Sequence, residues 1–177
     1  MIVVLEGCDC VGKTTFAEML SKKTGYKIEK GSSFEISKLG ADAMYRHMKS
    51  LLQKDNIIID RFFYSNLVYG ELFGYPMMNM EQINDLNNDL SKKGLVIYLK
   101  AKPSTIQERM YNRGDDMVSH SDINDILNGY KMWMGDAFVT PRTMLSLDTT
   151  QLNPNIATSM VCEMLNQDML KTHIKAT

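Results

Sequence analysis

Residues 7–14 read Gly-Cys-Asp-Cys-Val-Gly-Lys-Thr and directly follow the apolar run Ile2-Val3-Val4-Leu5. They match the pattern G-x-x-x-x-G-K-[ST] in the context that it requires, between the end of an expected strand and the start of an expected helix. Gly7 and Gly12 allow the backbone to bend until successive N–H groups point at one centre, and the N-terminus of the helix reinforces this anion site. The stretch therefore predicts a phosphate-binding loop that joins a strand to a helix.

The side chains of this loop indicate a nucleoside triphosphate as the ligand. Lys13 has the reach to contact the β- and γ-phosphates, and the Thr14 hydroxyl is placed to bind Mg²⁺. Small side chains at the intervening positions fit where the backbone must face a nucleotide. We expect ATP to be bound by Gly7, Cys8, Asp9, Cys10, Val11, Gly12, Lys13, Thr14 and Thr15.

The loop belongs to a chain of 177 residues with a net charge of −1. This length suits one domain spanning residues 1–177, and the mixed charges give no general attraction to nucleic acid or to membranes. The three cysteines, Cys8, Cys10 and Cys162, are too few for a disulfide framework, and Cys8-x-Cys10 lacks the spacing of a zinc site. A first strand that begins at Ile2 leaves no room for a signal peptide, so we expect a cytoplasmic protein.

Apolar runs alternate with helical stretches along the chain. Short continuous runs such as Ile57-Ile58-Ile59 are typical of central strands in a parallel sheet that is covered on both faces. The alternation predicts an α/β fold of the P-loop type: a three-layer, doubly wound, parallel five-stranded sheet with helices on both faces. The expected strands are 2–6, 26–30, 56–60, 95–100 and 144–148, and the expected helices are 13–23, 41–54, 64–73, 79–93, 103–112, 122–137 and 154–171.

Fifteen methionines are more than average composition supplies. Many fall at helical spacing, as in the pairs Met44 and Met48 or Met160 and Met164. Because methionine is a flexible filler of apolar interiors, we expect these pairs to face the core.

Two charged residues follow the third expected strand, Asp60 and Arg61. Ligands of doubly wound sheets bind at the carboxyl ends of the strands, which places both residues beside the phosphate loop. An acidic residue there commonly supports Mg²⁺, so Asp60 and Thr14 are the expected metal contacts, although a helix cap or a surface carboxylate is an alternative for Asp60. The Arg61 guanidinium has the geometry to grip a second phosphate group with two parallel hydrogen bonds. One phosphate loop and one arginine at a strand end indicate two phosphorylated ligands, a donor and an acceptor.

Three segments together resemble thymidylate kinase. They are Leu5-Glu6-Gly7-x-Asp9-x-x-Gly12-Lys13-Thr14-Thr15, Asp60-Arg61-Phe62-x-x-Ser65-Asn66-x-x-Tyr69, and Arg109-Met110-Tyr111-Asn112-Arg113-Gly114-Asp115-Asp116. The first is shared by many P-loop proteins, the second is the discriminating one, and the third is similar to the arginine-bearing lid of nucleoside monophosphate kinases. The resemblance implies small-molecule nucleotides as substrates, with ATP as donor and a monophosphate as acceptor.

The resemblance also implies a role for single residues around the acceptor. Asp9 would lie near the 3′-hydroxyl and the magnesium shell, and Arg61 would hold the 5′-phosphate. Asn66 would face the edge of the base, and Tyr69 would pack under the sugar and exclude a 2′-hydroxyl. Alternatives are a core position for Tyr69 and a capping or surface position for Asn66.

The lid implied by the resemblance spans about residues 109–121. Arg109 and Arg113 would close over the transferring phosphoryl group, and with Lys13 and Arg61 they form the expected catalytic set. The alternative for both lid arginines is a pair of solvated charges at a helix end. A transfer to a monophosphate requires positioning and charge neutralisation rather than a strong general base, because the acceptor is already ionised.

The chain departs from the thymidylate kinase pattern in the region that would contact the base. The second strand runs into Glu29-Lys30-Gly31-Ser32-Ser33 without the family's proline, and Gly70 stands where a polar residue is common. The arginine that one subgroup carries in the phosphate loop is replaced by Cys10, so a catalytic arginine has to come from the lid. The base-stacking and base-reading candidates in the short 31–56 segment are Phe34, Tyr45 and Arg46, of which we expect Arg46 to bind the substrate.

The leading hypothesis is an ATP-dependent kinase of deoxynucleoside monophosphates with dTMP as the first acceptor. One alternative is a deoxynucleoside kinase acting on a 5′-hydroxyl, with Glu6 or Asp60 recruited as base. Another is a P-loop nucleotide switch without a small-molecule acceptor, although the Asn-Lys-x-Asp and Asp-x-x-Gly patterns of a GTPase do not occur in the expected places. By resemblance the chain is also expected to form a homodimer. The helix at 64–73 is one candidate contact through Leu67, Leu72 and Phe73, which an ordinary core face explains equally well.

Overall fold

The computed structural model describes residues 1–114, 121–135 and 144–174. Within these residues five parallel strands form one sheet in the order β2-β3-β1-β4-β5. The central strand pairs on both sides, with Ile2 opposite Ile57 on β3 and Gly94 on β4. The strands are β1 (Ile2–Glu6), β2 (Lys27–Lys30), β3 (Ile57–Asp60), β4 (Gly94–Lys100) and β5 (Met144–Asp148).

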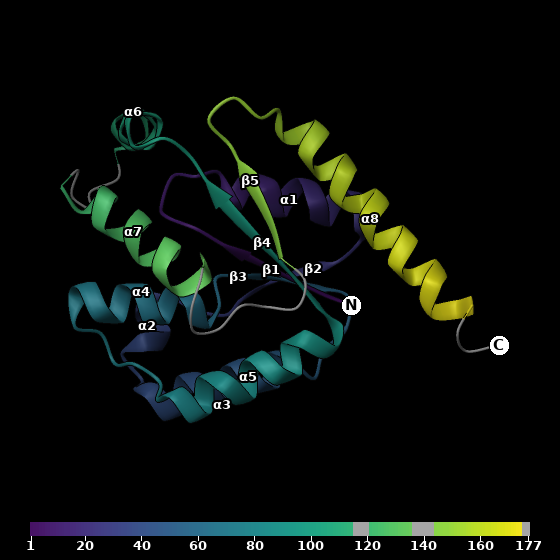
Figure 1. Ribbon diagram of the computed structural model, residues 1–177, viewed down its shortest axis with the longest axis horizontal. Helices are drawn as coiled ribbons and strands as arrows, with labels where there is room; N and C mark the ends of the chain where they lie inside the picture. The colour runs from purple at the N-terminus through teal and green to yellow at the C-terminus, as the bar shows by residue number, and fades with distance from the viewer. Residues whose placement is uncertain (115–120, 136–143, 175–177) are drawn as a thin grey trace.

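Helices cover both faces of this sheet, which confirms the three-layer, doubly wound α/β fold. Helices α1 and α8 pack together on one face, whereas α3, α4, α5 and α7 lie on the other (Figure 1). The helices are α1 (Lys13–Thr24), α2 (Phe34–Ser37), α3 (Ala41–Leu51), α4 (Phe63–Phe73), α5 (Met80–Lys93), α6 (Pro103–Arg113), α7 (Asp122–Gly135) and α8 (Pro154–Ile174).

Burial explains why the sheet could be predicted from apolar runs. All five side chains of β1 are buried, and so are Ile57, Ile58 and Ile59 on β3, because helices cover both faces of the central strands. The edge strand β5 instead alternates exposed and half-buried side chains. The buried residues of the sheet and of the helices belong to one hydrophobic core cluster.

The main differences from the expected helices are one helix that was not predicted and one that ends early. The short helix α2 was not predicted, and it begins after Ser33, whose hydroxyl accepts a hydrogen bond from the Ile36 N–H. Helix α3 ends at Leu51 rather than at residue 54, because Gln53 and Lys54 donate to carbonyls only three residues earlier and so leave the α-helical pattern. Residues 136 and 137 of the helix expected at 122–137 lie outside the described residues.

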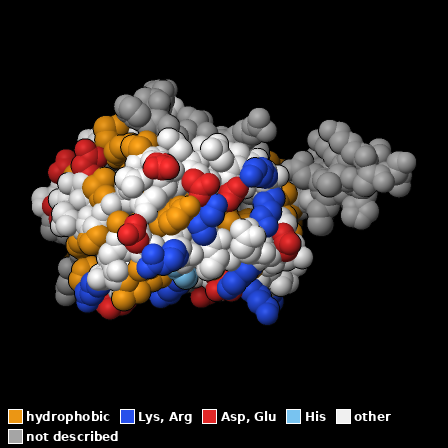
Figure 2. Space-filling view, turned by 90° about the horizontal axis from the view of Figure 1, so that it is seen from below, with side chains coloured by type: hydrophobic (Ala, Val, Ile, Leu, Met, Phe, Trp, Pro, Cys, Tyr) orange, Lys and Arg blue, Asp and Glu red, His pale blue; other side chains and the backbone are white. Residues whose placement is uncertain are grey.

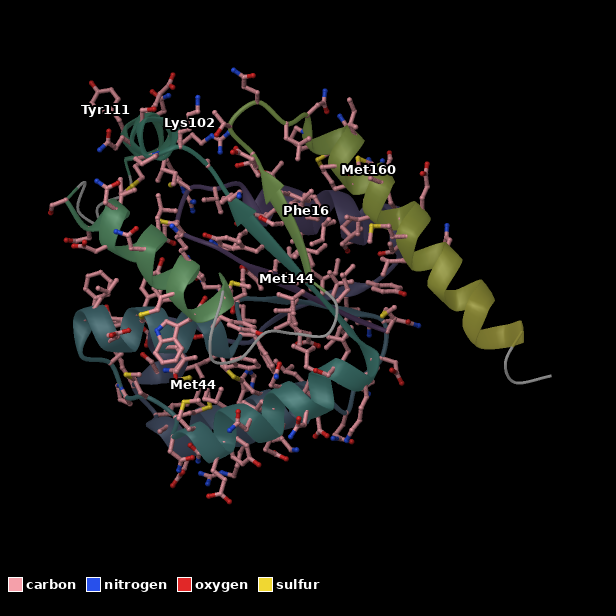
Figure 3. All side chains as sticks on the ribbon, in the orientation of Figure 1. Phe16, Met44, Lys102, Tyr111, Met144 and Met160 are labelled. Carbon is pink, nitrogen blue, oxygen red and sulfur yellow. The ribbon has the colours of Figure 1, made fainter. Side chains whose placement is uncertain are left out.

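The methionine prediction is correct for one pair and wrong for the other. Met44 and Met48 on α3 are fully buried, and Figure 3 labels Met44 beside this helix. Met160 and Met164 on α8 are instead 50% and 37% exposed, and Figure 3 labels Met160 on this helix. Spacing alone therefore identifies an apolar helix face without showing whether another element covers it.

The helix proposed as a dimer contact is largely part of the core. Leu67 is 1% exposed, Phe73 is half-buried, and of these three side chains only Leu72, at 39%, is exposed to solvent.

The face of the molecule that carries α3 and α5 shows Lys, Arg, Asp and Glu interspersed (Figure 2), with Lys49 paired to Asp85 at 2.7 Å. Among the described residues no helix combines the length and the apolar character needed to cross a bilayer.

Candidate active site

The phosphate loop has the backbone that its glycines predict. Gly7 adopts a φ of 140°, and a Cβ at this position would lie 2.1 Å from the Leu99 carbonyl oxygen of β4. Only glycine therefore fits between β1 and β4 here. The loop ends at Lys13, where α1 begins, and Thr14 and Thr15 are exposed at this helix N-terminus. The arrangement is an anion site with N–H groups and two hydroxyls facing outward.

Lys13 is folded back against its own loop. Its Nζ donates to the carbonyl oxygens of Gly7 at 2.9 Å and Cys8 at 2.7 Å, and the residue is only 7% exposed. Burial lowers the pKa of this lysine to about 8. The Cys8 thiol packs into the hydrophobic core, and burial raises its pKa to about 12.

A cavity of about 730 Å³ opens at the carboxyl ends of the strands, where the sequence places the chemistry. Among the described residues that line it, five are basic and two are acidic. An excess of cations around a cavity indicates ligands with several negative charges. The basic residues are Lys13, Lys30, Arg61, Arg109 and Arg113, and the acidic residues are Asp9 and Asp60.

Arg61 lines this cavity directly after β3. It has a φ of 62°, a left-handed conformation that few non-glycine residues adopt and that is often found at functional sites. Its Nη1 donates to the Gly7 carbonyl at 3.0 Å and to the Tyr130 hydroxyl at 3.1 Å, and its Nη2 donates to Asp9 Oδ1 at 2.5 Å. Since a guanidinium has five N–H groups, these contacts leave Nε–H and one Nη2–H without a strong partner among the described residues.

Asp9 links the phosphate loop to helix α4. Its second oxygen accepts a hydrogen bond from the Tyr69 hydroxyl at 2.6 Å, and the Arg61 guanidinium lies 5.0 Å from the centre of the Tyr69 ring. Burial opposes ionisation of Asp9, but the charges of Arg61 and Lys13 outweigh it and lower the pKa of this carboxyl. The structure thus brings together Asp9, Arg61 and Tyr69, the three residues that the resemblance placed around the acceptor. Asp9 accepts hydrogen bonds from both of the others.

A buried carboxylate behind Arg61 was missed as a structural element of the site. Glu6, fully buried at the end of β1, accepts the Phe62 N–H at 2.7 Å and the Ser65 N–H at 3.2 Å with one oxygen. Its other oxygen accepts the Ser65 hydroxyl at 2.6 Å and the Tyr130 hydroxyl at 3.3 Å. Burial raises the pKa of Glu6 although these hydrogen bonds and Arg61 oppose the shift. Glu6 therefore caps the N-terminus of α4 and fixes the groups that hold Arg61.

Asn66 is not directed at an open ligand site. Its Nδ2 donates to the Pro76 carbonyl at 2.8 Å, and its Oδ1 accepts the Met78 N–H at 3.1 Å. The amide therefore holds the segment of residues 74–78, called the 74–78 loop below, against α4. Gly70, one turn later, permits this approach, because a Cβ there would lie 2.2 Å from Met77 Cγ.

Four aromatic rings line one end of the cavity, the aromatic end. The distances between ring centroids are 5.5 Å for Phe34 and Tyr75, 6.0 Å for Tyr75 and Phe73, and 5.7 Å for Phe73 and Tyr69. These offset, tilted rings form a wall against which a planar group stacks favourably. Of the three candidates from the 31–56 segment, only Phe34 reaches this wall.

The expected substrate contact of Arg46 is not found. Arg46 is exposed on α3 and is not among the residues that line the cavity. Met44 and Met48 turn one face of α3 to the core, and Arg46, halfway between them, is directed away from it. Tyr45 also lies elsewhere, because its hydroxyl donates to Asp85 on α5 at 2.6 Å.

The two lid arginines separate in the structure. Arg109 Nη2 donates to the Thr149 carbonyl at 2.7 Å and Nη1 to the Thr149 hydroxyl at 3.1 Å, while that hydroxyl donates to the Val11 carbonyl at 2.9 Å. Arg109 thus holds the segment after β5 against the phosphate loop. The phosphate-loop end of the cavity is defined here by Lys13, Thr14, Arg109 and Thr149. Arg113 is exposed at the cavity rim, and residues 115–120 of the expected lid lie outside the described residues.

The residues present suit Mg²⁺ held jointly with a phosphorylated ligand. Asp60 Oδ1 is buried and has no hydrogen-bond partner among the described residues, and Asp60 lines the same cavity as Thr14. A carboxylate and a hydroxyl oxygen are ligands that Mg²⁺ prefers, with phosphate oxygens and water completing the shell. No group of three or more His, Cys, Asp or Glu within the described part of the chain forms a metal site by itself.

The phosphate loop, the parallel sheet and the cationic cavity at the strand ends define a P-loop kinase of nucleotides or nucleosides. No protein-family model matches the chain. The chain is 42% identical over 137 residues to the SPbeta prophage-derived uncharacterized protein YorR of Bacillus subtilis, covering 77% of this chain and 83% of YorR. The crystal structure of YorR in complex with phosphorylated GDP has a TM-score of 0.87 at 36% identity, covering 96% of this chain and 98% of that one. The chain therefore belongs to the YorR family.

Two more distant relatives carry kinase names. A probable thymidylate kinase of Archaeoglobus fulgidus is 25% identical over 142 residues, covering 64% of this chain and 71% of that protein. Deoxyguanosine kinase of Bacillus subtilis is 24% identical over 158 residues, covering 73% of this chain and 76% of that protein. The relatives agree on a phosphotransferase of the nucleotide kinase class and differ in the acceptor.

Proposed function

We propose that this protein transfers the γ-phosphoryl group of ATP to a deoxynucleoside monophosphate, with dTMP as the first acceptor to test. The observation that carries the proposal is the charge of the cavity, with five basic and two acidic residues among the described residues that line it. A triphosphate and a monophosphate bound together bring several negative charges, which these cations neutralise.

The position of Arg61 supports a phosphorylated acceptor. Asp9 and Tyr130 fix the guanidinium from one side, and Nε–H and one Nη2–H are left to meet a phosphate with two hydrogen bonds. The neighbouring strand β2 ends in Lys30, a second cation on the cavity wall. A kinase that phosphorylates a nucleoside would instead be expected to place a carboxylate base beside the acceptor. The acceptor end of the reaction is thus built for charge neutralisation.

In this proposal the chain's own residues position the two phosphorylated ligands, and Asp9 orients neighbouring groups rather than acting as a general base. The lowered pKa of Asp9 keeps it ionised, and its two oxygens bond Arg61 and Tyr69, which leaves it to orient these groups and the sugar. Thr14 and Asp60 would hold Mg²⁺, which supplies neutralisation of the charge that develops on the transferring group. Tyr69 supports the sugar and disfavours a 2′-hydroxyl, and Arg113 at the rim closes over the transferring group.

A deoxynucleoside kinase is the second candidate, and one observation favours it. Asp60 Oδ1 is buried in the cavity without a partner among the described residues, as a base awaiting a 5′-hydroxyl would be. Deoxyguanosine kinase is among the distant relatives. The YorR structure contains phosphorylated GDP, which supports a nucleotide with several phosphates in this family and does not by itself identify the acceptor.

The decisive experiment is ADP release from ATP and Mg²⁺ with matched pairs of acceptors, dTMP against thymidine and dGMP against deoxyguanosine. We expect stimulation by the monophosphates and little by the nucleosides, because Arg61 requires a phosphate. Activity with the nucleosides alone would assign the second candidate function. Slow ADP release that no acceptor stimulates would indicate a nucleotide switch.

A further inference from the structure

The polar side chains at the aromatic end of the cavity are largely used within the protein. Asn66 commits one N–H and its carbonyl oxygen to the 74–78 loop, where they bond Pro76 and Met78. The Ser33 hydroxyl accepts the Ile36 N–H at 3.3 Å, and the Ser37 hydroxyl donates to the Phe34 carbonyl at 2.7 Å. These groups line the cavity but are committed to local backbone.

Two polar groups at this end, the hydroxyls of Ser32 and Tyr75, have no hydrogen-bond partner among the described residues, and both discriminate weakly. A hydroxyl rotates, and it donates or accepts as the opposing group requires. Arg46, the expected base-reading arginine, lies on α3 outside the cavity. What remains for a base is the wall of Phe34, Tyr75, Phe73 and Tyr69.

Recognition of the sugar and the phosphate is, in contrast, fixed by buried charge. Asp9, Arg61 and Tyr69 are joined by hydrogen bonds of 2.5 and 2.6 Å and by the stacking of the guanidinium on the Tyr69 ring. These groups contact parts of a nucleotide that every base shares. Stacking on aromatic rings is also tolerant, because every base has a π-face.

We infer that the acceptor site selects deoxynucleoside monophosphates as a class and discriminates little among their bases. The inference rests on the proposed function. An apolar pocket separates similar ligands by about 10- to 200-fold, whereas a pocket that hydrogen-bonds its ligand rejects the wrong one by about 10⁴- to 10⁵-fold. The aromatic end resembles the apolar pocket, because the Asn66 amide is held by hydrogen bonds to the 74–78 loop.

Asn66 is therefore a positioning residue of the wall rather than a reader of the base. Its two contacts fix the orientation of its amide, since Pro76 offers only a carbonyl and Met78 only an N–H at these distances. Without these two hydrogen bonds the 74–78 loop and its Tyr75 ring are no longer held in place. This weakens the stacking surface for all bases to the same degree. Loss of Asn66 should thus weaken all acceptors together.

The test is kcat/KM of the full chain for dTMP, dUMP, dCMP, dGMP and dAMP at saturating ATP and Mg²⁺. The inference expects all five to be used, with a spread below about 200-fold. A larger preference for one base overturns the inference and leaves the proposed function intact. ADP release that none of the five stimulates removes the proposed function and the inference with it.

Variants separate the two roles of Asn66. In Asn66→Ala we expect the acceptor KM values to rise together with unchanged ratios among the bases, and in Asn66→Asp, which keeps the acceptor for the Met78 N–H, a smaller rise. A change in the ratios would show that Asn66 reads the base and would overturn the inference. Asn84→Ala, on the exposed side of α5, is the matched control. If Asn66→Ala does not fold, the panel with the unaltered chain still decides.

Discussion

The two ends of the cavity are built in different ways. The phosphate-loop end depends on the backbone of one continuous segment, residues 7–15, with a helix N-terminus behind it. The aromatic end is assembled by side chains from α2, α4 and the 74–78 loop, and Arg61 is held by Tyr130 from α7. Chemistry that depends on local backbone is specified by adjacent residues. Chemistry that depends on side chains is specified only when the fold determines which partner takes each hydrogen bond.

Loss of the lysine is the strongest way to break the phosphate-loop end. We expect Lys13→Ala to reduce kcat by on the order of 10²–10³-fold or more, because it removes a charge that stabilises the transferring phosphoryl group. Circular dichroism should show an intact fold, since the Lys13 ammonium bonds only loop carbonyls. Near-normal turnover would refute the assignment of this end to the donor.

Arg61→Ala should break the aromatic end selectively. The variant loses two charged hydrogen bonds to the acceptor phosphate, each worth about 1.5–3 kcal/mol, so the acceptor KM should rise by at least about 100-fold while the ATP KM stays nearly constant. Arg61→Lys keeps the charge without the fork and should recover only part of the loss. Equal losses for both substrates, measured by varying each in turn, would remove the distinction between the ends.

The fold could be predicted almost completely, and the reason lies in the local signals. A buried run such as Ile57-Ile58-Ile59 has few structural solutions other than a central strand. Asn79 and Gln82 form the reciprocal capping box that begins α5. Met160 and Met164 show the limit, because their spacing resembles that of Met44 and Met48 and yet no described element covers them.

The site could be predicted where residues adjoin the phosphate loop and not where distant elements compete for them. Asp9, Arg61 and Tyr69 come together as expected, through motifs at two strand ends. Asn66 was expected to face the base, but the 74–78 loop takes its amide. The sequence contains no short-range sign that Tyr130, 69 residues after Arg61, completes the same network.

The pKa of Lys13 gives a pH test that distinguishes the two ends. Burial lowers this pKa to about 8, so the free protein loses the Lys13 proton above that pH, whereas Arg61 stays charged. Binding of the triphosphate then has to restore the proton, and the Kd for ATP should rise by up to about tenfold per pH unit above pH 8. Affinity for the acceptor should change little over the same range, as isothermal titration of each ligand would show.

Lys13→Arg is the control for this pH dependence. A guanidinium stays protonated throughout, so the ATP affinity of the variant, although lower because of its size, should be flat from pH 7 to pH 9. A rise in Kd that persists in Lys13→Arg would assign the titration to another group.

Tyr130→Phe should have the smallest effect, and it tests whether α7 contributes to the aromatic end. The hydroxyl accepts from Arg61 Nη1 at 3.1 Å and lies 2.8 Å from the Ser65 hydroxyl and 3.3 Å from Glu6. Its removal leaves Arg61 paired with Asp9 and Gly7, so the guanidinium stays in the cavity but is held less firmly. We expect the acceptor KM to rise about three- to tenfold, which corresponds to about 1 kcal/mol, because Arg61 keeps its other partners.

A structural role alone for Tyr130 predicts a different result. The variant also leaves the buried Glu6 and Ser65 with one partner fewer, which should lower the free energy of unfolding by about 1–2 kcal/mol. Glu6→Gln disturbs the same buried network without touching the Arg61 contact of Tyr130, and it should lower stability with less change in the acceptor KM. If both variants lose stability and neither changes the acceptor KM relative to the ATP KM, α7 supports the core only. A rise of the acceptor KM confined to Tyr130→Phe would show that the arginine at the aromatic end is positioned from a helix far away in sequence.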